Sequence, residues 1–297
     1  MIHRVIVHAP SILSAPAKLN LGLEVLGKRP DGYHQIVTIL QTIDLCDELE
    51  FQPAPQLAYE SPFGTQDDLV ARALHALAEE GVTVEARIVL RKRIPVAAGL
   101  GGGSSDAGTL LGLLAQAGLP RPLVDRIAQR LGSDVPFFLD GGTALARGRG
   151  TDLEPLPPPD GWFVIVVPEV RLAHKTPRLY AALTPDDFSD GTATLRQAER
   201  LKRRSGIDPR LVRNAFLRPL LSFGEVRRTL DAMAAAGARW AWPSGAGPAI
   251  FTWMCDEEQA EEVARGLAEH GFRTLVSAPL RPNWEHAARG IEVVTVL

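Results

Sequence analysis

Residues 95–108 read Pro95-Val96-Ala97-Ala98-Gly99-Leu100-Gly101-Gly102-Gly103-Ser104-Ser105-Asp106-Ala107-Gly108. Four glycines fall within five positions, and two serines and an aspartate follow them. Because glycine lacks a Cβ atom, backbone N–H groups can close around an anion at this point. The apolar pattern that comes next predicts a helix whose positive N-terminal end points to the same place. The stretch therefore predicts a loop that binds phosphate, as in an enzyme that uses a nucleotide.

Three other glycine motifs do not fit this loop. The Walker pattern needs a lysine inside the loop, and residues 95–105 contain none. Ser104 stands where the dinucleotide fingerprint G-x-G-x-x-G has its third glycine. The sequence also lacks the His-Arg-Asp and Asp-Phe-Gly motifs of protein kinases. A plain flexible connection between a strand and a helix stays open as the alternative.

The loop offers only N–H and hydroxyl groups to a ligand. Mg²⁺ and residues from elsewhere in the chain must therefore neutralise the charge of a bound triphosphate. Ser104, Ser105 and Asp106 are the nearest candidates for contact with phosphate or metal. The same residue types also cap helix N-termini, and that role is equally open for them.

Composition limits the classes of function. The 297 residues are 45% apolar and 23% charged, as in a water-soluble globular protein, and the formal charge of −3 gives no reason to expect nucleic acid as a partner. Only Cys46 and Cys255 are present, which suits reduced thiols and argues against a disulfide framework or a structural zinc site. The N-terminus does not resemble a signal peptide, and the apolar run at 162–167 is too short to cross a bilayer. We expect a cytoplasmic protein with no membrane partner.

Three consecutive prolines, Pro157 to Pro159, mark the clearest break along the chain. We expect one domain over residues 1–159 and a second over residues 160–297. Before the break, the patterns predict a strand over 84–90, helices over about 106–117 and 122–131, and a short strand within 141–150. After it, they predict strands over 162–167, 249–253 and 274–276, helices over 195–204, 223–236 and 256–270, and a turn at 244–247. This order indicates an α+β layer with its helices on one face.

Two further segments accompany the glycine loop. They read Pro16-Ala17-Lys18-Leu19-Asn20-Leu21-Gly22-Leu23 and Pro243-Ser244-Gly245-Ala246-Gly247-Pro248-Ala249-Ile250-Phe251. Together the three segments resemble the motifs of the GHMP kinase superfamily, which phosphorylates small metabolites with ATP. The string Asp31-Gly32-Tyr33-His34 and the segments 131–136 and 141–150 are similar to one branch of it, whose substrate is a cytidine diphosphate compound of the non-mevalonate isoprenoid route. The resemblance spans nearly the whole chain.

The resemblance implies an α+β fold of two domains. The first would be like domain 2 of ribosomal protein S5, and the second would be ferredoxin-like. The implied cofactors are ATP and Mg²⁺, with ligands for the metal that the sequence does not identify. The implied partner is the small cytidine diphosphate substrate, and we expect a monomer or a weak homodimer.

The resemblance also implies roles for residues far apart in the chain. Asp134 would take the proton of the acceptor hydroxyl, and Lys18 would hold and polarise that hydroxyl. Phosphoryl transfer needs positioning and charge neutralisation, which a carboxylate base and an ammonium group can supply. Residues 95–105 would wrap the ATP phosphates. The residues implied in substrate binding are Asn20, Tyr33, His34, Tyr180 and Gly245, with Tyr33 and His34 on the cytidine and Tyr180 stacked on its base.

Each of these residue types has a structural alternative. Lys18 could lie on the surface, and Asp134 could cap the turn before Pro136. His34 and Tyr180 could be hydrogen-bonded or core side chains, and the turn at 244–247 could simply join two strands. The basic residues at 200–204 predict a solvated helix face. Other GHMP kinases, a nucleotide sensor without activity and an RNA-binding module stay as alternative functions.

The chain departs from the family pattern at three places. Ala97 and Ala98 stand where many relatives have glycine, and Ala246 replaces a frequent serine. Residues 214–217 read Asn-Ala-Phe-Leu where the family commonly has Asn-Asp-Leu-Glu. We therefore assign no catalytic role to Asn214.

Overall fold

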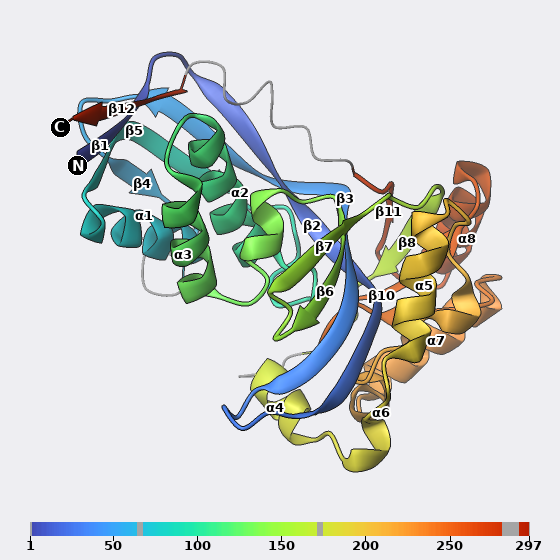
Figure 1. The fold of residues 1–297 in the computed structure, drawn as a ribbon. Helices are drawn as coiled ribbons and strands as arrows, with labels where there is room; N and C mark the ends of the chain where they lie inside the picture. Colours follow the sequence, from blue (N-terminus) through green and yellow to red (C-terminus); the bar gives the residue numbers. More distant parts are fainter. Residues whose placement is uncertain (1, 64–67, 171–174, 281–290, 297) are drawn as a thin grey trace.

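Two β-sheets organise the chain in the computed structural model, which describes residues 2–63, 68–170, 175–280 and 291–296. The larger sheet has the order β12-β1-β5-β3-β6-β7, with β2 paired to β3 and β4 paired to β5 (Figure 1). Its strands are β1 (Ile2–Val7), β2 (Ser11–Lys28), β3 (His34–Pro53), β4 (Ala58–Glu60), β5 (Val82–Arg91), β6 (Thr143–Gly148), β7 (Asp152–Leu156) and β12 (Ile291–Val296). The smaller sheet has the order β11-β8-β10-β9, built from β8 (Trp162–Val166), β9 (Trp242–Pro243), β10 (Ile250–Met254) and β11 (Thr274–Ser277).

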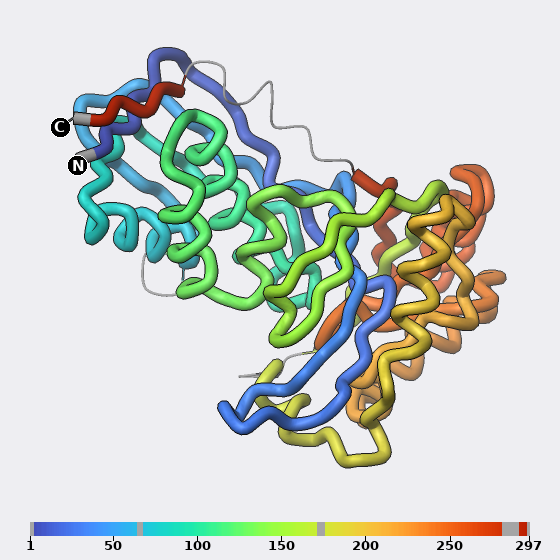
Figure 2. Tube along the Cα trace, in the orientation of Figure 1, coloured from blue at the N-terminus to red at the C-terminus, as the bar shows by residue number. Residues whose placement is uncertain are grey.

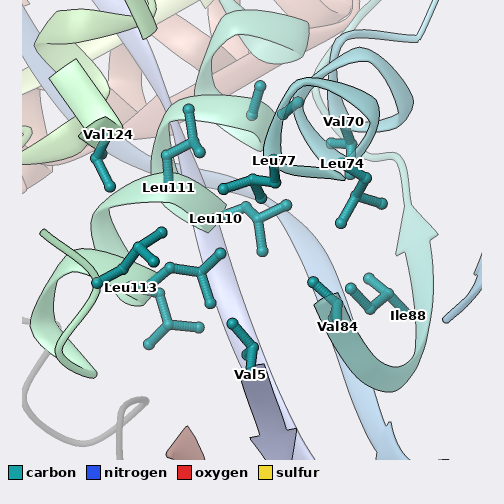
Figure 3. Close-up of a cluster of buried hydrophobic side chains, with 14 of the residues drawn as sticks. Val5, Val70, Leu74, Leu77, Val84, Ile88, Leu110, Leu111, Leu113 and Val124 are labelled. Atoms are coloured by element: carbon teal, nitrogen blue, oxygen red, sulfur yellow. The ribbon is translucent and has the colours of Figure 1, made fainter. Parts of the chain in front are cut away.

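Helices α1 (Leu69–Glu79), α2 (Gly102–Gln116) and α3 (Arg121–Leu131) pack against the larger sheet. Figure 3 shows Leu110 and Leu113 of α2 in one apolar cluster with Val5 and Val84 of the strands and Leu77 of α1. Fully burying one such side chain stabilises the fold by about 1.5–3 kcal/mol. The cluster fixes α2, and with it the glycine loop, on the sheet.

The smaller sheet is covered on both faces. Val164 and Val166 of β8 face a core that includes side chains of α7 (Gly224–Ala235) and α8 (Glu257–Glu269). Phe163 and Ile165 face the opposite way, into a core shared with β2, β3 and α5 (Thr192–Lys202). The remaining helices are α4 (Lys175–Ala181) and α6 (Leu217–Leu220), with short 3₁₀ turns at Pro136–Leu139 (η1), Pro185–Asp187 and Pro209–Leu211. The core that contains Phe163 and Ile165 therefore joins the two sheets through the middle of β2 and β3.

Strands β2 and β3 form a long hairpin that runs from the larger sheet past α4 (Figure 1). They pair antiparallel, with register shifts near Pro16, Asn20 and Val25. Every residue of β2 from Ala15 to Val25 is buried, although its apolar and polar residues alternate. Ala17, Leu19 and Leu21 enter one core, so Lys18 and Asn20 are buried on the opposite face of the strand. The register shift after Asn20 exchanges the two faces, and the buried Glu24 accepts hydrogen bonds from Ser189 Oγ and Thr194 N instead.

The expected α+β class is confirmed, and the expected strands and helices occur with shifted ends. The clearest correction concerns α2, which begins at Gly102 rather than at Asp106. Gly101, with φ of 75°, is its N-cap, and no side chain caps this end. The residues expected to cap the helix, Ser104, Ser105 and Asp106, thus lie inside it, at its third to fifth positions.

The proposed division at Pro159 falls between the two sheets, because β7 belongs to the larger sheet and β8 to the smaller one. Strand β12 then returns and pairs with β1, so the two ends of the described chain lie side by side (Figure 2). The domain bounds themselves stay a proposal.

Candidate functional site

One cavity of about 970 Å³ is lined by both parts of the chain. Its wall includes β2, the first part of β3, the glycine loop, α4 and the turn at 244–247. Among the predicted site residues it brings together are Lys18, Asn20, Tyr33, His34, Ala97, Gly99, Gly101, Ser104, Asp134, Tyr180 and Gly245. A single cavity thus holds candidates for catalysis, for ATP binding and for substrate binding.

Lys18 and Asp134 meet in this cavity. The Lys18 Nζ atom lies 3.8 Å from Asp134 Oδ2, although the residues are far apart in sequence. Lys18 is only 4% exposed, which removes the surface alternative, whereas the Asp134 side chain is 40% exposed. Burial lowers the pKa of Lys18, and the nearby Asp134 carboxylate partly opposes this effect. An ammonium group and an accessible carboxylate are therefore held together beside space for a ligand.

A hydrogen-bond relay orients Lys18. Its Nζ donates to Asn20 Oδ1 at 2.6 Å, and Asn20 Nδ2 donates to Thr38 Oγ1 at 2.9 Å. Thr38 Oγ1 in turn donates to the carbonyl of Gly22 at 2.5 Å. This chain fixes which end of the Asn20 amide faces the lysine. Sequence reasoning did not identify Thr38, because Asn20 pairs with Leu40 and Leu23 pairs with Thr38, a register shift that brings Thr38 within reach of Asn20.

The glycine loop is shaped by close neighbours. Gly99 has φ of 89°, and a Cβ atom there would lie 2.3 Å from the Ser244 carbonyl oxygen. A Cβ atom on Gly101 would lie 3.0 Å from Lys18 Cγ. Ala97 also has a positive φ, 55°, in the left-handed region that favours glycine, which fits the glycine many relatives have there. Glycine is thus needed at position 99 for the close approach of Ser244, and at position 101 for the close approach of Lys18.

The loop fits an anion at the cavity wall. The first turn of α2 has no side-chain cap, so its N–H groups and positive end can serve a phosphate group. Ala97, Gly99, Gly101 and Ser104 line the cavity. The other predicted loop residues are not part of that wall: Pro95, Val96, Ala98, Leu100, Gly102, Gly103 and Ser105.

Two polar residues near the start of α2 have structural partners. The buried Ser105 hydroxyl donates to the Pro16 carbonyl at 2.6 Å. Asp106 is 2% exposed and accepts a hydrogen bond from Lys92 at 2.6 Å, and Lys92 also binds the buried Asp47. Burial raises the pKa of Asp106 to about 8. These contacts anchor the start of α2 to β2, β3 and the end of β5.

Aromatic rings line another part of the cavity. The His34 and Tyr180 rings stack at 4.7 Å between centroids, and Phe216 meets Tyr180 edge-on at 4.8 Å. The Arg149 guanidinium lies 4.3 Å from the centre of the Tyr33 ring, a cation–π contact that sequence reasoning missed. Partial burial lowers the pKa of His34, which favours its neutral form. These four rings, Tyr33, His34, Tyr180 and Phe216, are called the aromatic group below. The aromatic group can stack on a planar base, and the Arg149 guanidinium presents a cation beside it.

The described part of the chain holds neither a cluster of metal-binding side chains nor a membrane-spanning helix. There, no three or more His, Cys, Asp or Glu side chains gather so as to hold a metal ion. No helix among the same residues has the length and apolar character needed to span a membrane.

The sequence and the fold match a known class of kinase. The GHMP kinases N terminal domain matches residues 68–142, and the GHMP kinases C terminal domain matches residues 199–272. The chain belongs to the GHMP kinase family, and it is a small-molecule kinase that uses ATP.

Within that family, the chain is similar to curated proteins named 4-diphosphocytidyl-2-C-methyl-D-erythritol kinase. The kinase of Dehalococcoides mccartyi strain 195 is 37% identical over 280 residues, covering 91% of this chain and 98% of the relative. That of Pelotomaculum thermopropionicum is 40% identical over 285 residues, covering 90% and 97%. A crystal structure of 4-(cytidine 5'-diphospho)-2C-methyl-D-erythritol kinase matches with a TM-score of 0.73 and 35% identity, covering 90% of this chain and 98% of that one. The expected family and two-part fold are confirmed.

Proposed function

We propose that this cavity transfers the γ-phosphoryl group of ATP to the 2-hydroxyl of 4-diphosphocytidyl-2-C-methyl-D-erythritol, giving the 2-phosphate and ADP. The observation that carries the proposal is the meeting of Lys18 and Asp134, at 3.8 Å, in a cavity that also holds the glycine loop and the aromatic group. The similarity over nearly the whole chain to kinases named for that substrate supports the choice of acceptor.

Asp134 accepts the proton of the acceptor hydroxyl as its oxygen bonds to phosphorus. The carboxylate is accessible from the cavity and lies beside the Lys18 ammonium group. Lys18 polarises the hydroxyl and stabilises charge on the transferred group, while Asn20 holds the lysine in place. These side chains supply positioning and charge, which are the main demands of phosphoryl transfer.

ATP would lie with its phosphates against the glycine loop. The uncapped start of α2 and the cavity-lining residues Gly99, Gly101 and Ser104 supply backbone N–H and hydroxyl donors there. The loop contains no lysine, so bound Mg²⁺ would neutralise the triphosphate charge, and Ser104 and Asp134 are among the oxygen donors at the wall. Gly102 and Gly103, at the start of α2, would add their N–H groups, and the other residues from 95 to 105 would shape the loop around the phosphates.

The cytidine would bind at the aromatic group. Tyr180 and His34 offer ring faces for the base, and Arg149, held over Tyr33, offers a cation to the diphosphate. The Gly245 backbone would approach the substrate beside Lys18. The proposal includes a cytoplasmic enzyme that works as a monomer or weak homodimer on a small molecule, with no nucleic acid or membrane partner.

An ADP-release assay tests the acceptor. We expect turnover with 4-diphosphocytidyl-2-C-methyl-D-erythritol and none above background with mevalonate, homoserine or galactose at equal concentration. These three alcohols control for phosphoryl transfer by the same fold without recognition of cytidine. Turnover of one of them in the absence of turnover of the cytidine compound would overturn the proposed acceptor.

A further inference from the structure

The turn formed by residues 243–247 closes on the catalytic groups from the second half of the chain. Ser244 Oγ donates to the Gly99 carbonyl at 3.0 Å, and Ala249 N donates to the Ala98 carbonyl at 2.9 Å. A Cβ atom on Gly245 would lie 3.1 Å from both Lys18 Nζ and Asn20 Oδ1. The position of this turn therefore sets one wall for Lys18 and one for the glycine loop.

Asn214 holds this turn with its side chain. Its Nδ2 atom donates to the carbonyls of Pro243 and Gly245, at 2.8 and 3.0 Å. Its Oδ1 atom accepts from the N–H of Phe216 at 2.8 Å. Only an amide can satisfy this pattern without loss, because two donors face two carbonyls and one acceptor faces an N–H group.

The backbone around Asn214 is itself fixed to β2. Leu23 N donates to the Arg213 carbonyl at 2.7 Å, and Ala215 N donates to the Leu23 carbonyl at 2.9 Å. Leu23 follows Lys18 and Asn20 on the same strand. The contacts thus close a ring, from Lys18 along β2 to Asn214, and from there through Gly245 back to Lys18.

The ring also reaches the aromatic group. Phe216, whose N–H is bound by Asn214, meets the Tyr180 ring edge-on at 4.8 Å. One amide therefore uses its donors on the side of the phosphoryl transfer groups and its acceptor on the side of the stacking ring.

We infer that Asn214 is a positioning residue that sets the turn against Lys18 and the glycine loop with its donors, and Phe216 behind Tyr180 with its acceptor. This inference rests on the proposed function. A positioning role differs from a purely structural one because the Asn214 donors then affect kcat, whereas its acceptor affects KM for the cytidine substrate. A shift of about 1 Å at a reacting group can lower a rate by about 100-fold, so a displaced turn affects kcat.

Two substitutions separate the two ends of the amide. Asn214→Asp keeps the acceptor for Phe216 and loses both donors, so we expect kcat to fall at least 10-fold and KM for the cytidine substrate to stay within about threefold. Asn214→Ala loses both ends, so we expect the same fall in kcat together with a rise in KM of about fivefold or more. In both variants, hydrogen exchange of residues 243–249 should be faster than in the wild type.

Gln197 provides a matched control. It is buried, and its amide likewise bridges backbone groups, accepting from Asp208 N at 3.0 Å and donating to the Gly206 carbonyl at 3.4 Å, but it does not line the cavity. Gln197→Ala should keep kcat and KM while losing comparable thermal stability. A comparable fall of kcat in Gln197→Ala would show that general destabilisation explains the effect, and would overturn the inference.

The two proposals fail in different ways. A wild-type protein that does not phosphorylate the cytidine compound contradicts the proposed function, and the hydrogen-exchange measurement still tests Asn214. Unchanged exchange at residues 243–249 in Asn214→Asp overturns the positioning role. So does a kcat within threefold of the wild type in both Asn214 variants, if the wild type is active.

Discussion

At the scale of single residues, Lys18 combines the catalytic role that we propose for it with a cost to stability. It is 4% exposed, and burial lowers its pKa below the ordinary lysine value of 10.5. The unfolded chain therefore binds the lysine proton more tightly than the folded chain does. The charged lysine thus disfavours folding at neutral pH, and stability rises as pH increases through the lowered folded-state pKa toward the unfolded value.

We accordingly predict that Lys18→Met raises the unfolding temperature at pH 7 and lowers kcat by about 100-fold or more. Methionine fills a similar space without a charge, and the 40% exposed Asp134 side chain remains hydrated. The gain in unfolding temperature over the wild type should shrink at alkaline pH, where the wild-type lysine loses its proton. Thermal unfolding at several pH values, together with turnover assays, measures both effects.

Asp134→Asn serves as the comparison for Lys18→Met. It should lower kcat by about 100-fold while leaving the affinity for an ATP analogue nearly unchanged, but it should give no comparable gain in stability. A Lys18→Met protein that unfolds at a lower temperature than the wild type would contradict the account of the buried charge. Near-normal turnover in Asp134→Asn would remove that carboxylate from the reaction.

At the scale of elements, two glycines of α2 allow the segment that carries Asp134 to approach. A Cβ atom on Gly108 would lie 2.6 Å from Phe138 Cβ, and one on Gly112 would lie 2.3 Å from the Leu139 carbonyl oxygen. Both neighbours belong to η1, which begins two residues after Asp134. The helix that begins at the glycine loop thus also places the Asp134 carboxylate.

We predict that Gly112→Ala destabilises the protein by about 1–3 kcal/mol, because backbone must move to admit the new atom. It should also lower kcat, since η1 carries Asp134 with it. Gly224→Ala is the control, as Gly224 starts α7 and no atom lies within 4 Å of its added Cβ. Alanine favours a helix over glycine, so the control should be neutral or stabilising. Equal unfolding midpoints for the two variants in denaturant would contradict the close packing of α2 on η1.

Sequence patterns predicted α2, α3, β5, β8 and α8 because one apolar face or a buried run distinguishes each of them. They did not reveal the extent of β2, where Lys18, Asn20 and Glu24 occupy positions that read as solvent-facing but are buried. Motif resemblance identified Lys18 and Asp134, but Thr38, Arg149 and Asn214 could not be placed in the site. Their contacts with the cavity residues depend on strand register and on the approach of the two halves, which local sequence pattern does not encode.

At the scale of the whole molecule, the path of the chain ties its two ends together at a distance from the site. β12 pairs antiparallel with β1 from Ile2↔Val296 to Val7↔Ile291. Ile291 is 8% exposed and belongs to the apolar cluster beneath α1 and α2. Among the described residues, neither β1 nor β12 contributes to the cavity wall. Stability and chemistry are therefore separable at this end of the fold.

We predict that deleting residues 291–297 lowers the unfolding temperature by about 5 °C or more, while kcat measured well below that temperature stays within about threefold of the wild type. The deletion exposes the edge of β1 and removes Ile291 from the apolar cluster, so increased aggregation on heating should accompany it. Glu292→Ala, which keeps the backbone pairing to Ile6, is the control and should change the unfolding temperature little. Thermal unfolding and turnover assays on the wild type, the truncated protein and Glu292→Ala test this prediction. An unchanged unfolding temperature in the truncated protein would show that β12 does not stabilise the larger sheet. A large loss of kcat would show that the two ends of the chain influence the distant cavity.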